Sequence, residues 1–224
     1  RPVAVTADPV KPFRLGAWPT PLQRLDRLSA ALGAPPLLVK RDDLSGFGFA
    51  GAKARALEQL VGDAISRRRD VLVVGGGPSS NLVAATAAAA KTAGMGCVAV
   101  LYGDAGKHQH TNLSLTRSLD AQVHYTGDDD RSSVDAAVSE VAAELARQGA
   151  RPYEIPRGGA TPLGAVGSAL AVGEVARQLA EVDVRPSHLV VASGSGGIQA
   201  GLLAGSHAAG APWQVVGISV SRPT

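Results

Sequence analysis

The chain has 224 residues, of which 45% are hydrophobic and 4% aromatic, and its 22 Lys and Arg residues exceed its 19 Asp and Glu residues by three. These basic residues are spread along the chain, whereas nucleic-acid binding is predicted by a concentrated basic face. No apolar run approaches the roughly 20 residues of a membrane span, and residues 1–11 lack the apolar core of a signal peptide, so we expect a cytoplasmic protein without nucleic-acid or membrane partners.

Short β-branched runs alternate with longer amphipathic stretches along the chain, which predicts an α/β protein with a parallel sheet flanked by helices. Strands are expected at residues 37–40, 71–74, 97–101, 123–125, 188–192 and 214–219. Helices are expected at residues 53–66, 133–147, 163–180 and 198–207. The second of these helices opens on Ser133, a residue type that caps helices, and carries an apolar stripe that includes Val134 and Val138.

Three polar features each have a structural and a functional interpretation. The arginines at 67–69 predict the capped C-terminal end of a helix rather than a nucleic-acid contact. The aspartates at 128–130 predict a solvated turn, because three adjacent carboxylates cannot all face one metal ion. The lone Cys97 excludes an internal disulfide and fits a reducing compartment; we interpret it as a core residue rather than a nucleophile, because no His lies in its local motif.

Two glycine-rich turns, GGGPSSN at residues 75–81 and SGSGGIQ at residues 193–199, each follow a predicted strand and open a helix. Such a turn leaves backbone N–H groups unpaired at the positive end of the helix dipole, which suits an anion. Each turn could instead serve only to bring strand and helix close together. Neither has the Gly-Lys-Ser/Thr ending of a P-loop or the spacing of the dinucleotide fingerprint. Two such turns in one chain favour a ligand with two anionic ends.

The stretches KRDDLSG at residues 40–46 and AGAKARALE at residues 50–58 carry a family resemblance. They resemble the KRDDL start and the GGNKxRxLE signature of the D-cysteine desulfhydrase and 1-aminocyclopropane-1-carboxylate deaminase family. Further matches follow in the family's order over residues 14–222, among them WPTPL at 18–22, GGPSSN at 76–81 and IPRGGATPLG at 155–164. These relatives are fold-type II enzymes of the tryptophan-synthase-β architecture that depend on pyridoxal 5'-phosphate.

The resemblance implies a role for each part of the site. Lys53 would hold the cofactor as a Schiff base and take the substrate's α-proton. The cofactor phosphate would rest on the turn formed by Gly194, Ser195, Gly196, Gly197 and Ile198, with Asn81 as a further cofactor contact. Ser80, Asn81 and Leu82 would bind the substrate, with its carboxylate on the Ser80–Asn81 turn, and Ser80 would also take part in catalysis. The structural alternatives are a surface helical lysine for Lys53 and a simple N-cap for Ser80.

The same resemblance implies two lobes, a large one at residues 1–45 and 159–224 and a small one at residues 46–158, with the active site between them. It also implies a homodimer and the absence of a metal. The expected reaction is β-elimination or β-replacement on a small amino acid, with ring-opening deamination as the nearest variant.

Several positions depart from the family pattern, and most of these changes remove polar groups from the pocket. They are Ala50, Ala52, Ser79, Leu82, Ala84, Ser168 and Ile198. The family's chains also continue beyond the length of this one, so the C-terminal third is expected to be absent, cleaved or supplied by a separate fragment. The alternative function is therefore a non-catalytic or specialised-pathway relative that keeps the fold, with or without the cofactor, but not the usual substrate.

Overall fold

The computed structural model of the chain describes residues 10–106 and 110–220. Most of the 1–11 segment, in which no signal peptide is expected, lies outside the described residues, as do the last four residues of the predicted large lobe. The described chain is an α/β structure with parallel sheets flanked by helices, which is the predicted fold class. It begins with an antiparallel pair, β1 (Leu22–Arg24) and β2 (Leu38–Lys40), which are connected by α1 (Asp26–Leu32) and followed by the short helix η1 (Asp42–Leu44).

A four-stranded parallel sheet occupies the middle of the chain. Its spatial order is β5 (Gln122–Tyr125), β4 (Gly96–Leu101), β3 (Val71–Gly76) and β6 (Pro152–Ile155). The sequence predicted the first three of these strands but missed β6, which begins with a proline and contains a glutamate. Those residues are tolerated because β6 is an edge strand that pairs only with β3.

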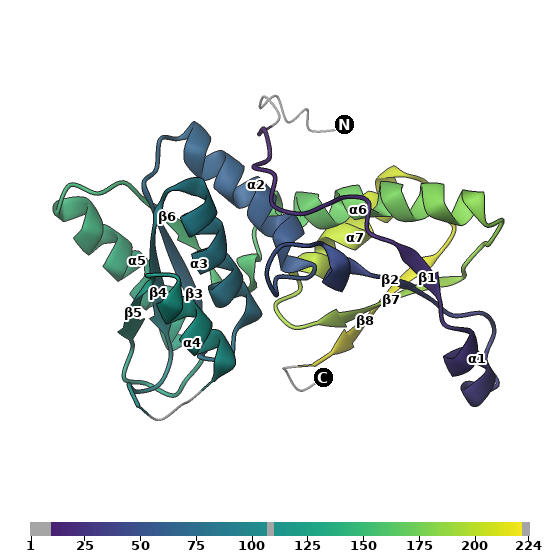
Figure 1. Ribbon diagram of the computed structural model, residues 1–224, viewed down its shortest axis with the longest axis horizontal. Helices are drawn as coiled ribbons and strands as arrows, with labels where there is room; N and C mark the ends of the chain where they lie inside the picture. Colours follow the sequence, from purple (N-terminus) through teal and green to yellow (C-terminus); the bar gives the residue numbers. More distant parts are fainter. Residues whose placement is uncertain (1–9, 107–109, 221–224) are drawn as a thin grey trace.

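Helices cover both faces of this sheet (Figure 1). On one face lie α2 (Lys53–Ser66), α3 (Asn81–Ala93) and α4 (Thr111–Ser118), whose buried side chains form one apolar cluster with alternate residues of β3 and β4. On the other face α5 (Ser133–Arg147) packs Val134 and Val138 against the intervening strand residues. The two central strands, β3 and β4, carry no polar side chain because a parallel sheet between two helical layers is buried on both sides.

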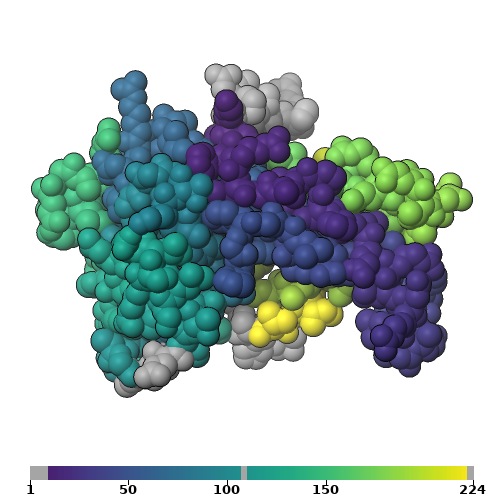
Figure 2. Space-filling model, in the orientation of Figure 1, coloured from purple at the N-terminus to yellow at the C-terminus, as the bar shows by residue number. Residues whose placement is uncertain are grey.

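The remaining elements form a second group at the right of Figure 1. They are η2 (Arg157–Gly159), α6 (Pro162–Glu181), β7 (His188–Ser193), α7 (Gly197–Ala208) and β8 (Gln214–Ser219), and β7 pairs with β8 in parallel. Two glycines of α7 bring the two long helices together, since a Cβ on Gly201 would lie 2.2 Å from the Ala165 carbonyl oxygen. In Figure 2 the purple N-terminal residues lie across the middle of the visible face, between the teal and green parts.

The arginines at 67–69 and Cys97 lie where their structural interpretations place them, whereas the expected cap of α5 was wrong. The arginines at 67–69 directly follow α2, and Arg67 pairs with Asp63. Cys97 is buried in the core, and burial raises the pKa of its thiol to about 12. Ser133 is the first residue of α5 rather than its cap; the position before it, Ser132, makes no capping side-chain bond, so the expectation of a Ser133 cap was wrong.

None of the helices within residues 10–106 and 110–220 is long and apolar enough to cross a membrane. Within the same part of the chain, no three His, Cys, Asp or Glu side chains are grouped so that they could hold a metal ion. The aspartates at 128–130 are exposed, and two of their carboxylates accept hydrogen bonds from nearby backbone N–H groups.

Candidate active site

The first glycine-rich turn connects β3 to α3, as predicted. Ser80 occupies the N-cap position, where its Oγ accepts a hydrogen bond of 3.3 Å from the backbone N–H of Val83. Ser80 therefore does act as an N-cap, but this contact uses only the acceptor capacity of its hydroxyl. A hydroxyl that accepts a bond keeps its own O–H to donate to a ligand. The turn also runs close to Tyr102, since a Cβ on Gly77 would lie 2.6 Å from the tyrosine ring.

The second glycine-rich turn connects β7 to α7, also as predicted. Gly196 has a φ of +86°, a left-handed conformation that side chains other than glycine rarely adopt. The first N–H groups of α7, beginning at Gly197, have no carbonyl partner within the helix. The side chain of Ile198 points away from this turn and packs in the apolar cluster of α6, α7 and β7. Only its backbone N–H is therefore available to an anion.

Lys53 is the first residue of α2, and its side chain reaches the loop that follows β6. Its Nζ donates a hydrogen bond of 3.2 Å to the carbonyl oxygen of Gly158. Gly158 itself has a φ of +73° and lies under Ser195, because a Cβ added to it would be only 2.0 Å from the serine Oγ. The Gly158 loop thus connects the lysine directly to the second glycine-rich turn.

These parts line one cavity of about 600 Å³, which we call the cleft. Of the residues predicted for the site, the cleft is lined by Lys53, Ser80, Asn81, Leu82, Gly194 and Ser195. Gly196, Gly197 and Ile198 are not among its lining residues, although they follow Ser195 directly in the turn. The volume is in the range of about 300–1,000 Å³ that small-molecule sites occupy.

Sequence reasoning missed several side chains that line the same cleft, namely Tyr102, Arg131, Asp135 and Arg157. Arg157 and Asp135 form an ion pair, with the arginine Nε 2.7 Å from the Asp135 Oδ1. Tyr102 directly follows β4 and Arg157 closely follows β6, at the carboxyl ends where parallel sheets place their ligands. That rule could have identified both residues, but β6 had not been predicted.

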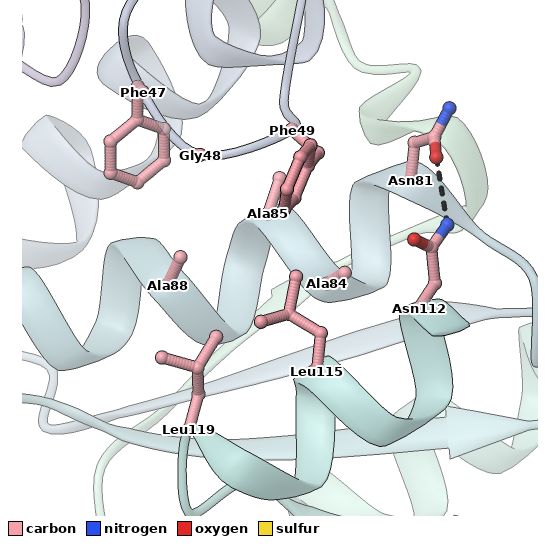
Figure 3. Close-up of a pocket in the computed structure, with 10 residues that line it drawn as sticks. All are labelled: Phe47, Gly48, Phe49, Asn81, Ala84, Ala85, Ala88, Asn112, Leu115 and Leu119. Carbon is pink, nitrogen blue, oxygen red and sulfur yellow. Dashed lines mark hydrogen bonds between the residues drawn. The ribbon is translucent and has the colours of Figure 1, made fainter. Parts of the chain in front are cut away.

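A smaller apolar pocket of about 180 Å³ adjoins the first turn and shares Asn81 with the cleft (Figure 3). The Nδ2 of Asn112 donates to the Asn81 Oδ1 at 2.8 Å and to the Ser79 carbonyl oxygen at 2.8 Å. Asn81 therefore uses its amide oxygen in this pair, and its amide nitrogen points away from Asn112. The nitrogen is left as a donor, which suits an anion bound at the turn.

Burial lowers the pKa of the Lys53 amine below the ordinary lysine value of 10.5. The cause is the loss of water around the ammonium form, which disfavours the charge. The position of Lys53 at the first turn of α2 acts in the same direction, because the helix dipole places partial positive charge there. The fold thus favours a neutral amine, the form that can act as a nucleophile or a base.

This depressed pKa leads to a testable effect of pH on stability. Below the folded-state pKa the protein holds a buried ammonium, and this penalty disappears as the pH rises toward 10.5. We expect Lys53→Met protein to be more stable than wild type at pH 7, with the difference in free energy of unfolding shrinking as the pH rises to 10. Urea unfolding of both cofactor-free proteins across this range measures it. If the difference in free energy of unfolding stayed constant with pH, Lys53 would not have a lowered pKa in the folded protein.

The sequence of this chain is similar to those of known proteins. The family model described as pyridoxal-phosphate dependent enzyme matches residues 13–223. A putative 1-aminocyclopropane-1-carboxylate deaminase of Pyrococcus abyssi is 42% identical over 207 residues, covering 92% of this chain and 62% of the relative. A D-cysteine desulfhydrase of Salmonella paratyphi C is 39% identical over 209 residues, covering 91% of this chain and 62% of the relative.

Solved structures show the same likeness. The crystal structure of an ACC deaminase homologue has a TM-score of 0.88 and 38% identity, and covers 95% of this chain and 63% of its own. A fungal L-serine ammonia-lyase from Rhizomucor miehei has a TM-score of 0.73 at 18% identity, covering 92% of this chain and 60% of its own, and so shares the fold. The chain spans about 62% of the length of the curated relatives it matches.

Proposed function

Because the chain belongs to the family of pyridoxal-phosphate dependent enzymes, we propose that it acts on a small amino acid as a lyase or deaminase. The reaction would begin with removal of the α-proton and proceed by β-elimination or β-replacement. The names of the D-cysteine desulfhydrase and deaminase relatives support this substrate class. The observation that carries the proposal is that Lys53, the Ser80–Asn81 turn and the Gly194–Ser195 turn line one cleft.

The residues of this cleft fit the cofactor. Burial lowers the pKa of the Lys53 amine and so favours its neutral form, which is the form that can join the cofactor covalently. The turn before α7, with its left-handed Gly196 and its free N–H groups, is a receptor for a phosphate. When bound, pyridoxal phosphate supplies an electron sink for the pair left at the substrate's Cα.

Four residues that line the cleft would carry out the separate steps of this reaction. Lys53 would hold the cofactor and, once released by the substrate amine, take the proton from Cα. The free O–H of Ser80 and the amide nitrogen of Asn81 would bind the substrate carboxylate. Leu82 lines the same cleft and is almost fully buried, so it would exclude water beside the bound substrate.

The experiment that tests the proposal measures ammonia released from D-cysteine and from 1-aminocyclopropane-1-carboxylate by the protein loaded with pyridoxal phosphate. In Ser80→Ala protein we expect kcat/KM to fall about ten- to a hundredfold, because a hydrogen bond to a charged carboxylate contributes about 1.5–3 kcal/mol. Part of any loss in stability comes from the missing cap, so Ser80→Asn, which restores a capping side chain, is the matched control. Equal kcat/KM in wild type and Ser80→Ala would place the carboxylate elsewhere.

The second candidate function is a relative that keeps the fold but does not turn over an amino acid. The apolar character of Leu82, which lines the cleft, is the observation that favours it. Ala84 lines the smaller pocket rather than the cleft, and Ser168 is buried outside the cleft near α7, so neither removes a group from the site itself. The second function is supported if the loaded protein neither releases ammonia from any amino acid of a wide panel nor exchanges its α-proton with deuterated solvent, because elimination and replacement both begin with removal of that proton.

The division into lobes belongs to the same proposal. The four-stranded sheet lies wholly within residues 46–158, while the β1–β2 and β7–β8 pairs lie outside that range, which supports the predicted boundaries. The homodimer, the separate C-terminal fragment and the cytoplasmic location stay predictions. Sedimentation of the purified protein would test the first of these directly.

A further inference from the structure

Several charged residues of the two family-like stretches do not line the cleft. Lys40, Asp42 and Arg55 are absent from its lining residues, and Arg55 is only 4% exposed. A charge buried so deeply is costly unless it is paired and hydrogen-bonded. These residues therefore need an explanation other than contact with cofactor or substrate.

Arg55 is held by two carboxylates from different parts of the chain. Its Nε and one terminal nitrogen donate to the two Asp42 oxygens, each at 2.8 Å. Its two terminal nitrogens donate to the two Glu174 oxygens, each at 2.9 Å. The planar fork of arginine is suited to such paired contacts. Burial acts to lower the pKa of Arg55, but the hydrogen bonds that it donates to both carboxylates outweigh it and raise that pKa.

Further contacts join Arg55 and its two carboxylates to three more residues. We call the resulting set of Thr20, Trp18, Lys40, Asp42, Arg55 and Glu174 the Arg55 network. Lys40 balances the charge, with its Nζ 3.0 Å from Glu174, and the Thr20 Oγ1 donates to Asp42 at 2.8 Å. The guanidinium also stacks on Trp18, with its carbon 3.9 Å from the ring centroid. The network thus fastens α2 to the segment before it and to α6, which carries Glu174.

No side chain caps the start of α2. Its N-cap residue, Ala52, makes no side-chain capping bond, and the preceding Gly51 is in a left-handed conformation. The backbone N–H groups of Lys53 and Ala54 donate instead to the carbonyl oxygens of Ala50 and Gly51, so the side-chain contacts that hold this turn in place come from further along the helix. Lys53 is the first residue of this uncapped start, and Arg55 lies two residues further along.

We propose that Arg55 is a positioning residue for Lys53: by fastening the uncapped first turn of α2 to Asp42 and Glu174, it keeps the Lys53 amine directed at Gly158 in the cleft. The functional meaning of that position rests on the proposed function. The position itself is a property of the cofactor-free protein and can be measured without turnover.

The experiment compares the reactivity of Lys53 in wild type, Arg55→Met and Asp42→Asn proteins. Cofactor-free protein is labelled with trace acetic anhydride between pH 6 and 11, and mass spectrometry of the Lys53 peptide gives the pKa of its amine. The other charged side chains lining the cleft, Arg131, Asp135 and Arg157, are unchanged in every variant.

The two substitutions separate positioning from a simple change of charge. Loss of a cation at 55 alone would raise the pKa of Lys53, and loss of an anion at 42 alone would lower it. If the first turn loosens and Lys53 gains water, both variants raise the pKa toward the ordinary value. We expect a rise of a pH unit or more in each, with about tenfold weaker covalent capture of pyridoxal phosphate.

The matched control removes a buried contact at the other end of the same helix. Tyr153→Phe deletes the hydrogen bond of 2.8 Å from the tyrosine hydroxyl to Asp63, and should destabilise α2 without moving the pKa of Lys53. Shifts of opposite sign in the two network variants, or an equal rise in Tyr153→Phe, would overturn the proposal. If Arg55→Met does not fold, Asp42→Asn decides, since an unchanged or lowered pKa there contradicts positioning. If wild type captures no pyridoxal phosphate while the pKa shifts are seen, the proposed function fails and the positioning role stands.

Discussion

Protein with Lys53 replaced by alanine is expected to carry no covalently attached pyridoxal phosphate. The wild-type amine would condense with the cofactor's aldehyde and release one water, and borohydride would then fix the link as a stable secondary amine. Removing the amine removes this link altogether. It also removes the group proposed to take the α-proton, and general acid–base groups contribute about 10²–10⁴-fold to a rate. We therefore expect turnover to fall by at least about a hundredfold.

Mass spectrometry after borohydride treatment checks this prediction, since the mass of the fixed cofactor should be found on the Lys53 peptide. Lys91→Ala is the matched control, because Lys91 is an exposed lysine of α3 that pairs with Asp120. It should leave cofactor attachment unchanged. A Lys53→Ala protein that still carried fixed cofactor would show that another lysine holds it, and would remove the basis of the proposed site.

Most of the fold could be predicted from the sequence, because the signals were local. Six strands and four helices were expected from apolar periodicity, and β8 and α2 begin and end at the predicted residues. The elements that were missed have weak local signals. The strand β1 has three residues, and β6 begins with proline and is accepted at the sheet edge only because β3 provides its partner. Neighbours in space, not in sequence, make these segments strands.

The candidate site was predicted only as far as each signal was local. The two glycine-rich turns and the start of α2 could be identified because each is a short contiguous motif. Asp135 could not, since its pairing with Arg157 depends on how η2 and α5 are brought together. The same limit applies to Ile198, whose side chain packs against apolar residues of α6 and β7 that are distant in the sequence. The Arg55 network spans residues more than a hundred positions apart, and no local pattern reports such a contact.

We expect a second large effect from Gly158→Ala, which adds a single methyl group. This residue has three functions at once: its carbonyl oxygen accepts the Lys53 bond, its left-handed backbone shapes the loop, and its missing side chain leaves room for Ser195. An alanine at a φ of +73° costs about 1–2 kcal/mol in strain. Its Cβ would also lie 2.0 Å from the Ser195 Oγ, so the serine and its turn must move.

Gly158→Ala should therefore weaken binding of pyridoxal phosphate at least about tenfold, the change that 1.4 kcal/mol produces in an equilibrium constant. Absorbance titration with the cofactor measures this. Gly149→Ala is the matched control, because Gly149 is also left-handed, at a φ of +92°, but nothing lies within 4 Å of its added Cβ. Both variants bear the backbone strain, and only Gly158→Ala also disturbs Ser195 and Lys53. If the two variants bound the cofactor with equal affinity, the phosphate would not rest on the Ser195 turn, because displacing that turn would then have no effect on binding.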